Sequence, residues 1–263
     1  MAEQTPVGPR IAILGGTGRM GVPLAANWAH AGYEVMITSR NVQKAQKIVD
    51  QLLTGRGLRM AAPAGGGIEV PPLRDQAAAK RWRLTAGSVR DAVTADVIVL
   101  GVIFDQQWAQ LAEIKDELMG QGKVFIDMTN PYIPRPEMTT GIPKGEMPPG
   151  GPAAVLYHQA KLGDPTARWC GAFKHVLWMN IQPDGSAKRA EGVDGVEVFG
   201  DAEAVEITTQ IMRRSGWRPV VRGDLSVAPQ YEIKGPKAKG TWYGFFGSPD
   251  WTARFIGDKL TIW

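Results

Sequence analysis

The chain has 263 residues, of which 44% are hydrophobic and 21% charged, and its formal net charge at pH 7 is +4. This length can bury a full core, and the composition is typical of a globular protein rather than a disordered one. The basic residues are scattered instead of forming one run, which argues against nucleic acid as a partner. A single cysteine, Cys170, excludes an intrachain disulfide and a metal site built from several thiolates.

The sequence contains no sign of a membrane segment or a leader. No stretch approaches the roughly 20 apolar residues of a spanning helix, and the first ten residues, MAEQTPVGPR, lack the apolar core of a signal peptide. We therefore expect a cytoplasmic protein without a membrane partner, in which Cys170 is a buried and unreactive thiol.

In the first half of the chain, short apolar runs alternate with helical repeats. Strands are expected at residues 10–14, 33–38, 96–103 and 124–128. Helices are expected after the glycines that follow residue 14, after Asn41 as an N-cap, and after Asp105 as a second cap. This alternation predicts a parallel sheet with helices on its faces.

The second half is less regular. Residues 55–67 show no periodicity and are interpreted as a surface excursion of loop and short strand, and residues 130–152 are rich in proline and glycine, as in a linker or a lid. Further strands are expected at residues 172–179, 193–199 and 218–221, with a helix capped by Asp201 between the last two.

These patterns predict an α/β fold, with a Rossmann-type doubly wound parallel sheet and a smaller C-terminal α/β lobe. An NADP-binding domain is expected over residues 1–150, including the proline-rich linker. A lobe for substrate binding or dimerisation is expected over residues 151–263.

A glycine motif lies between the first strand and the first helix. Residues 16–21, GTGRMG, match G-x-G-x-x-G and follow a further glycine, Gly15. Such a motif can be a turn without a ligand, but its position between strand and helix is that of a dinucleotide fingerprint, whose glycines allow a tight turn and the close approach of a pyrophosphate.

The residues after the second strand favour NADP over NAD. An NAD enzyme would place an acidic residue here, against the ribose hydroxyls. This chain has Ser39 and Arg40 instead, followed by Lys44. Arg40 can make a bidentate contact to a 2′-phosphate and Ser39 can donate a hydrogen bond, whereas Lys44 fits equally well as a solvated residue at a helix start.

Taken together, these motifs resemble the NADPH-dependent reductases of the deazaflavin coenzyme F420. The segments that carry the resemblance, between about residues 10 and 227, are ILGGTGRMG, TSR with a basic residue four positions later, IDMTNP, GDAEAV and SGWRPVVRGDL. The resemblance implies a reductase that uses NADP(H), with coenzyme F420 as the co-substrate.

The resemblance also implies a set of cofactor contacts. The pyrophosphate side would be met by Gly16, Thr17, Gly18, Arg19 and Met20. The 2′-phosphate would be met by Ser39, Arg40 and Lys44. The nicotinamide half would be lined by Val102, Ile103 and Phe104, with Asn130 and Pro131 nearby.

Hydride transfer between a nicotinamide and a deazaflavin needs stacking, a short distance and exclusion of water, but no catalytic triad. A small carbonyl or imine substrate would need a proton donor, for which the candidates are His175, Lys174, Tyr132 and His158. A structural role is the alternative reading for His175, which lies on an expected strand. The catalytic residues are thus unknown, with His175 as the first candidate.

The tail combines aromatic and basic side chains. Its aromatic residues are Trp242, Tyr243, Phe245, Phe246 and Trp251, and its basic residues are Lys234, Lys237, Lys239 and Arg254. They could stack on an acidic planar ligand such as a deazaflavin, or pack on the domain or on the second subunit of a homodimer.

Three hypotheses remain. The chain is an NADP-dependent oxidoreductase with a deazaflavin partner, an NADP-dependent dehydrogenase or reductase of a small carbonyl or imine, or a non-catalytic NADP-binding redox sensor. A homodimer without a metal ion is expected.

Overall fold

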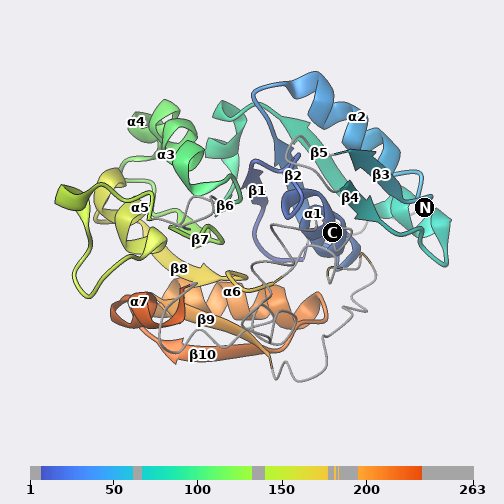
Figure 1. The fold of residues 1–263 in the computed structure, drawn as a ribbon. Coiled ribbons are helices and arrows are strands. Elements are labelled where there is room, and N and C mark those ends of the chain that lie inside the picture. The colour runs from blue at the N-terminus through green and yellow to red at the C-terminus, as the bar shows by residue number, and fades with distance from the viewer. Residues whose placement is uncertain are drawn as a thin grey trace, which may run out of the picture.

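Eight strands of the chain form one continuous sheet (Figure 1). The computed structural model describes residues 7–61, 67–131, 140–176, 181, 183 and 195–232. Across the sheet the strand order is β10-β9-β8-β7-β6-β1-β2-β5. All neighbouring strands are parallel except β8 and β9.

The strands of this sheet are β1 (Ile11–Leu14), β2 (Glu34–Thr38), β5 (Arg83–Gly87), β6 (Val97–Leu100), β7 (Val124–Asp127), β8 (Arg168–Ala172), β9 (Val196–Gly200) and β10 (Pro219–Gly223). A separate antiparallel pair consists of β3 (Leu58–Ala61) and β4 (Gly67–Val70). The α-helices are α1 (Gly21–His30), α2 (Val42–Leu52), α3 (Phe104–Glu113), α4 (Lys115–Leu118), α5 (Ala154–Leu162), α6 (Ala202–Arg214) and α7 (Ala228–Tyr231). Short 3₁₀ helices are η1 (Gln76–Arg81), η2 (Arg90–Thr94), η3 (Lys144–Glu146) and η5 (Leu225–Val227).

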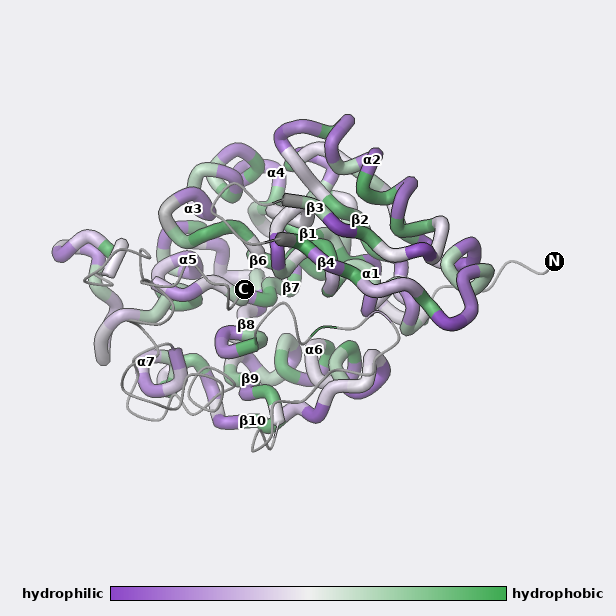
Figure 2. The backbone as a smooth tube through the Cα atoms, turned by 45° about the vertical axis from the view of Figure 1, so that its right-hand side comes forward, coloured by the Kyte–Doolittle hydropathy of each residue, from purple (hydrophilic) through white to green (hydrophobic). Residues whose placement is uncertain are grey.

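Helices cover both faces of the sheet. The odd positions of β1, Ile11 and Ile13, pack in one core with α1, α2 and α6, and the even positions, Ala12 and Leu14, pack in a second core with α3, α4 and α5. Because successive side chains of a strand point to opposite faces, burial on both sides requires the continuous apolar run seen in the sequence. On α2 hydrophobic and hydrophilic residues alternate with the helix period (Figure 2), as expected for a helix with one face on a sheet. The prediction of a doubly wound Rossmann-type sheet is confirmed.

The helix starts were predicted with mixed success. The side chain of Asn41 accepts a hydrogen bond from Lys44 N at 2.9 Å and caps α2, as predicted. The cap at Asp105 was wrong, because the N-cap of α3 is Ile103, two residues earlier, and the helix begins at Phe104. Helix α6 follows Asp201, but the carboxylate of Asp201 accepts its hydrogen bond from Trp169 N of β8, at 2.8 Å, instead of capping its own helix.

The strand predicted at residues 172–179 was also misplaced. Strand β8 ends at Ala172, and the next residue, Phe173, has a positive φ of 57°. With a left-handed backbone conformation at Phe173 the extended strand cannot continue, so the chain turns. Lys174 and His175 lie in this turn instead of on a strand. Residues 177–179 lie outside the described part of the chain.

Strand β5 and helix α5 were not predicted, whereas the short strand expected in the surface excursion over residues 55–67 is present as β3, which pairs with β4 at the end of that range. Strands from both sides of residue 150 join in the same sheet, since β7 pairs with β8. The division into domains at that residue stays a prediction. None of the helices in the described part of the chain combines the length and apolarity needed to cross a bilayer.

Candidate functional site

The glycine motif forms the turn between β1 and α1. Gly15 has a φ of +73°, which favours glycine, and Gly18 N donates to Gly15 O at 2.9 Å. A Cβ on Gly16 would lie 2.9 Å from Ile13 O, and one on Gly21 would lie 2.6 Å from Gly16 Cα. The turn itself therefore requires these glycines, whether or not a ligand binds.

Gly18 differs from the other glycines of the turn. A Cβ there would meet one atom within 4 Å, Gly15 O at 3.1 Å, and the residue has no left-handed φ. The turn thus leaves open space beside Gly18, at the N-terminus of α1, where backbone N–H groups and the helix dipole favour an anion. A cradle of this kind, which a side chain would begin to fill, fits the pyrophosphate of a dinucleotide.

The cations expected to meet a 2′-phosphate follow β2, with Arg40 before α2 and Lys44 in the first turn of that helix. Ser39 N donates to Gly87 O at 3.0 Å, and Ser39 Oγ accepts from Asn41 N at 3.1 Å, which fixes the backbone before α2. Arg40 and Lys44 are exposed, and within the described residues neither forms an ion pair with a carboxylate. Both are therefore available to an anionic ligand.

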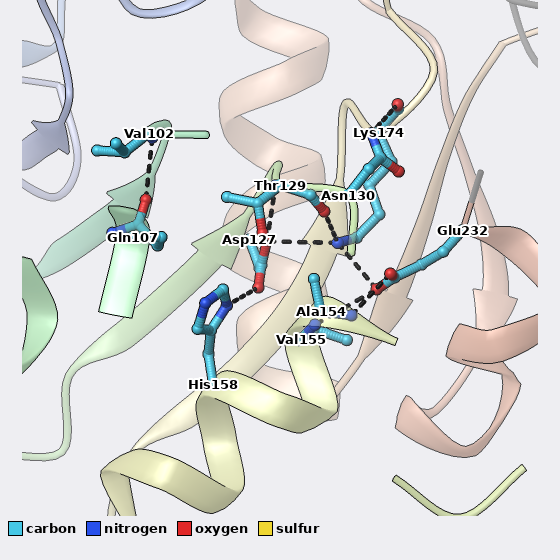
Figure 3. A network of polar contacts seen from close by, with 10 residues as sticks. All are labelled: Val102, Gln107, Asp127, Thr129, Asn130, Ala154, Val155, His158, Lys174 and Glu232. Atoms are coloured by element: carbon cyan, nitrogen blue, oxygen red, sulfur yellow. Dashed lines mark hydrogen bonds and ion pairs between the residues drawn. The ribbon is translucent and has the colours of Figure 1, made fainter. Parts of the chain in front are cut away.

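On the other side of β1, the end of β6 meets the glycine turn. A Cβ on Gly15 would lie 2.6 Å from Val102 Cγ2, so the two residues are in close contact. Val102 N donates to Gln107 Oε1 at 2.9 Å, which holds this segment against α3 (Figure 3). The side chain of Ile103 is 55% exposed, whereas the ring of Phe104 is buried. The structure thus brings the glycine turn and the predicted nicotinamide lining together.

A buried ion cluster lies at the carboxyl end of β7 (Figure 3). Lys174 Nζ lies 3.3 Å from Asp127 Oδ1 and 2.9 Å from Glu232 Oε1, and it donates to Thr129 O at 2.6 Å. All four residues are at most 5% exposed. Burial would lower the pKa of Lys174, but the two carboxylates raise it above its usual value.

Asp127 is the centre of the cluster. Its Oδ2 accepts from His158 Nδ1 at 2.8 Å, and its Oδ1 accepts from Thr129 N and Thr129 Oγ1, both at 2.7 Å. Burial alone would raise the pKa of Asp127, but Lys174, His158 and Thr129 together hold it at about 2. The carboxylate is therefore ionised, and it fixes the orientation of the His158 ring.

Glu232 connects the cluster to helix α5. Its carboxylate accepts from Ala154 N at 2.7 Å and from Val155 N at 3.3 Å, both in the first turn of α5. These N–H groups have no partner within the helix, so Glu232, from a distant segment of the chain, caps the N-terminus of α5. Burial raises the pKa of Glu232, and the charge of Lys174 opposes this effect.

The remaining predicted cofactor contacts adjoin the cluster. Asn130 Nδ2 donates to Lys174 O at 2.9 Å, and Pro131 O accepts from Gly141 N at 2.8 Å. The ring of Phe104 lies 5.3 Å from that of His158, measured between centroids. Asp127 itself was not predicted, although a carboxylate that ends the apolar run VFID was a signal for it.

His175, the first candidate for catalysis, faces another part of the sheet. It is buried, and its Nδ1 lies 3.3 Å from Glu197 Oε2 on β9, whose other oxygen lies 3.4 Å from an Arg222 nitrogen. Strand β9 is three places from β6 in the sheet. Tyr132 and the aromatic and basic tail lie outside the described residues, so their predicted roles stay predictions.

The thiol of Cys170 is buried. Its Sγ lies 3.0 Å from Thr208 Oγ1, and burial raises its pKa to about 12, which fits an unreactive residue. Within the described part of the chain, no group of three or more His, Cys, Asp or Glu side chains is placed to hold a metal ion.

Solved structures share this fold. The hypothetical protein SMa0349 from Sinorhizobium meliloti superposes with a TM-score of 0.60 at 19% identity, over 87% of this chain and 92% of that one. A putative F420-dependent NADP-reductase from Arthrobacter sp. FB24 superposes with a TM-score of 0.59 at 21% identity, over 92% of this chain and 96% of that one. At these identities the likeness establishes the Rossmann-type fold alone.

Sequence comparison adds a family. Residues 10–131 match the family described as NADP oxidoreductase, coenzyme F420-dependent. Over 122 residues the chain is 35% identical to the F420-dependent NADP reductase of Methanothermobacter thermautotrophicus, an alignment that covers 46% of this chain and 43% of that protein. The resemblance inferred from the motifs is thus confirmed for the N-terminal part, and the chain matches less than half the length of this relative.

The ion cluster predicts a pH-dependent contribution to stability. The pKa of Asp127 is about 2 in the folded chain and about 3.9 in an unfolded one, so its ionisation stabilises the fold above pH 4 and ceases to do so as the pH falls toward 2. We expect Asp127→Asn to lower the free energy of unfolding by roughly 3 kcal/mol at pH 7, and by progressively less below pH 4. Urea titrations of both proteins at pH 7, 4 and 3 measure the difference. The exposed Asp75→Asn change is the control, and a penalty for Asp127→Asn that is equal at pH 7 and 3 would contradict the prediction.

Proposed function

We propose that this chain is an NADP(H)-dependent oxidoreductase that transfers a hydride between NADP(H) and a deazaflavin of the coenzyme F420 type. The observation that carries the proposal is the open glycine turn at Gly18 beside the segment after β2, which carries two exposed cations, Arg40 before α2 and Lys44 in its first turn. The family match over residues 10–131 supports the same activity.

The ends of the cofactor site follow from these residues. Arg40, with Ser39 and Lys44, would hold the 2′-phosphate at the end of β2, and the N-terminus of α1 would hold the pyrophosphate. A dinucleotide lies across the crevice where the strand order reverses, which here is between β2 and β6 at β1. The nicotinamide half would then lie at the ends of β6 and β7, beside Phe104 and Asn130.

The bound cofactor would supply the hydride, and the chain would orient the reacting rings and exclude water. The buried ring of Phe104 and the apolar segment before it offer a dry wall for this purpose. The two titratable donors near this end, His158 and Lys174, are buried and bonded to Asp127. Their burial favours transfer between two ring systems over reduction of a carbonyl that needs a protein acid.

The proposal of a deazaflavin partner goes beyond what the matched part of the sequence supports. It rests on the family description and on the printed name of a relative that the chain matches over less than half its length. The cytoplasmic location, the homodimer and the part of the tail in binding the acceptor belong to the same proposal.

The first test is cofactor preference. We expect NADPH to bind at least about tenfold more tightly than NADH, a difference of about 1.4 kcal/mol, because Arg40 meets the 2′-phosphate. Arg40→Ala should remove most of this preference and leave the affinity for NADH nearly unchanged. Calorimetric titration measures both dissociation constants, with the exposed Lys47→Ala on the following helix, α2, as the control. Comparable affinities of the parent for the two cofactors would reject the proposed 2′-phosphate site.

The second test asks whether the glycine turn binds the cofactor or is only a structural turn. Gly18→Val should abolish NADPH binding, because its side chain occupies the open space, and should preserve the far-UV circular dichroism spectrum. Gly21→Ala is the contrasting variant: it should reduce stability, since its Cβ would lie 2.6 Å from Gly16 Cα. Normal NADPH binding by Gly18→Val would show that the motif is a turn without a ligand.

The third test identifies the acceptor. Single-turnover oxidation of NADPH is measured with coenzyme F420 and with a panel of small carbonyls and imines. With the deazaflavin, His175→Ala and Tyr132→Phe should each keep the rate within about tenfold of the parent, whereas loss of a general acid would slow carbonyl reduction by roughly 10² to 10⁴. A collapse of the deazaflavin rate in either variant favours the dehydrogenase, and tight binding with no oxidation by any acceptor favours the redox sensor.

A further inference from the structure

The buried cluster at the end of β7 contains two carboxylates and one ammonium. We propose that Asp127, Lys174 and Glu232 together place a net negative charge beside the nicotinamide half of the cofactor site, and so shift the preference of the chain toward NADP⁺ relative to NADPH. This inference rests on the proposed NADP site and concerns which redox form that site favours.

Burial raises the pKa of Glu232, but the hydrogen bonds indicate that both carboxylates are ionised. Every partner of Asp127 among the described residues is a donor: the Thr129 backbone and hydroxyl, the His158 ring and the Lys174 ammonium. Glu232 likewise accepts from two backbone N–H groups of α5 and from Lys174. A protonated carboxyl would need an acceptor, and no described partner of either residue supplies one. The N-terminus of α5 offsets part of the excess, so about half a negative charge or more remains.

A short series of contacts connects the glycine turn to this cluster. Gly15 touches Val102, as described above, and a Cβ on the preceding residue, Gly101, would lie 3.1 Å from Met128 Cε. Met128 directly follows Asp127, and its N donates to Leu100 O of β6 at 3.2 Å. The ring of Phe104 provides a second connection, since it packs on His158, which is bonded to Asp127. Through Phe104 and His158 the cluster therefore adjoins the segment that would line the nicotinamide half.

The two redox forms of the cofactor differ in charge at this end. The nicotinamide ring is positively charged in NADP⁺ and neutral in NADPH. Half to one unit charge at about 10 Å, with an effective dielectric constant near 20, changes the relative affinity by roughly fourfold to fifteenfold. Because the cluster is buried, salt should screen this effect less than it screens exposed charges.

The experiment compares equilibrium binding of NADP⁺ and of NADPH, with no turnover. The preference is the dissociation constant of NADPH divided by that of NADP⁺, and it should fall by roughly fourfold to fifteenfold in Glu232→Gln and in Asp127→Asn. The double variant Glu232→Gln with Lys174→Met removes one charge of each sign. It should return the preference to near the parent value, which a loss of packing would not do.

Glu117→Gln is the matched control. It removes the same charge from a surface pair, in which Glu117 Oε1 lies 2.6 Å from an Arg90 nitrogen, and it should leave the preference unchanged. Ile103→Lys adds a positive charge at an exposed position of the same edge, where folding is not at risk, and it should lower the preference.

Circular dichroism first establishes which variants are folded. An unchanged preference in a folded single variant or in Ile103→Lys, or a double variant that behaves like the single one, would overturn the inference. A parent protein that binds neither form of the cofactor would instead overturn the proposed function. Repeating the measurement at high salt distinguishes a buried charge from a surface charge. The change in preference should persist at high salt because the cluster is buried.

Discussion

The ammonium of Lys174, held between the carboxylates of Asp127 and Glu232, is the interaction on which the rest of the site depends. It joins the end of β7, the turn after β8 and the segment after α7, and through Glu232 it reaches the first turn of α5. Removing one partner from a buried ion pair costs roughly 3–5 kcal/mol, because the other charge stays in a medium that solvates it poorly. The cluster therefore holds together segments that lie far apart in the sequence.

The predicted cofactor contacts take their geometry from this cluster. Asn130 is positioned by the carbonyl oxygen of Lys174, and the ring behind Phe104 is His158, which Asp127 orients. On the other side of the sheet's centre, the glycine turn is positioned by backbone packing and by its contact with Val102. Close backbone packing at the glycine turn and the buried ion cluster thus hold the two halves of the proposed cofactor site, and both would limit its rearrangement on binding of a ligand.

The parts of the structure that were predictable from the sequence depend on short-range chemistry. Asn41 as a cap and the glycine turn are readable because their partners lie within a few residues. The ion cluster was not readable, because Lys174 and Asp127 are 47 residues apart, and only the strand order brings them together. The strand predicted over residues 172–179 was wrong for a local reason. Phe173 adopts a positive φ that its side chain disfavours, so residue propensities do not indicate the turn.

Charge is used in opposite ways at the two ends of the proposed cofactor site. At the end of β2, Arg40 is exposed and has no carboxylate partner among the described residues, so it can pair with a phosphate without first breaking an ion pair. At the end of β7, Asp127 is buried and bonded, so it can act on a ligand through its field but not by direct contact. The resulting field is positive where NADP⁺ carries its phosphates and negative where it carries the charged ring. A dinucleotide bound in the reverse direction would meet repulsion at both ends, so the charges proposed to favour the oxidised form would also select one orientation of the cofactor.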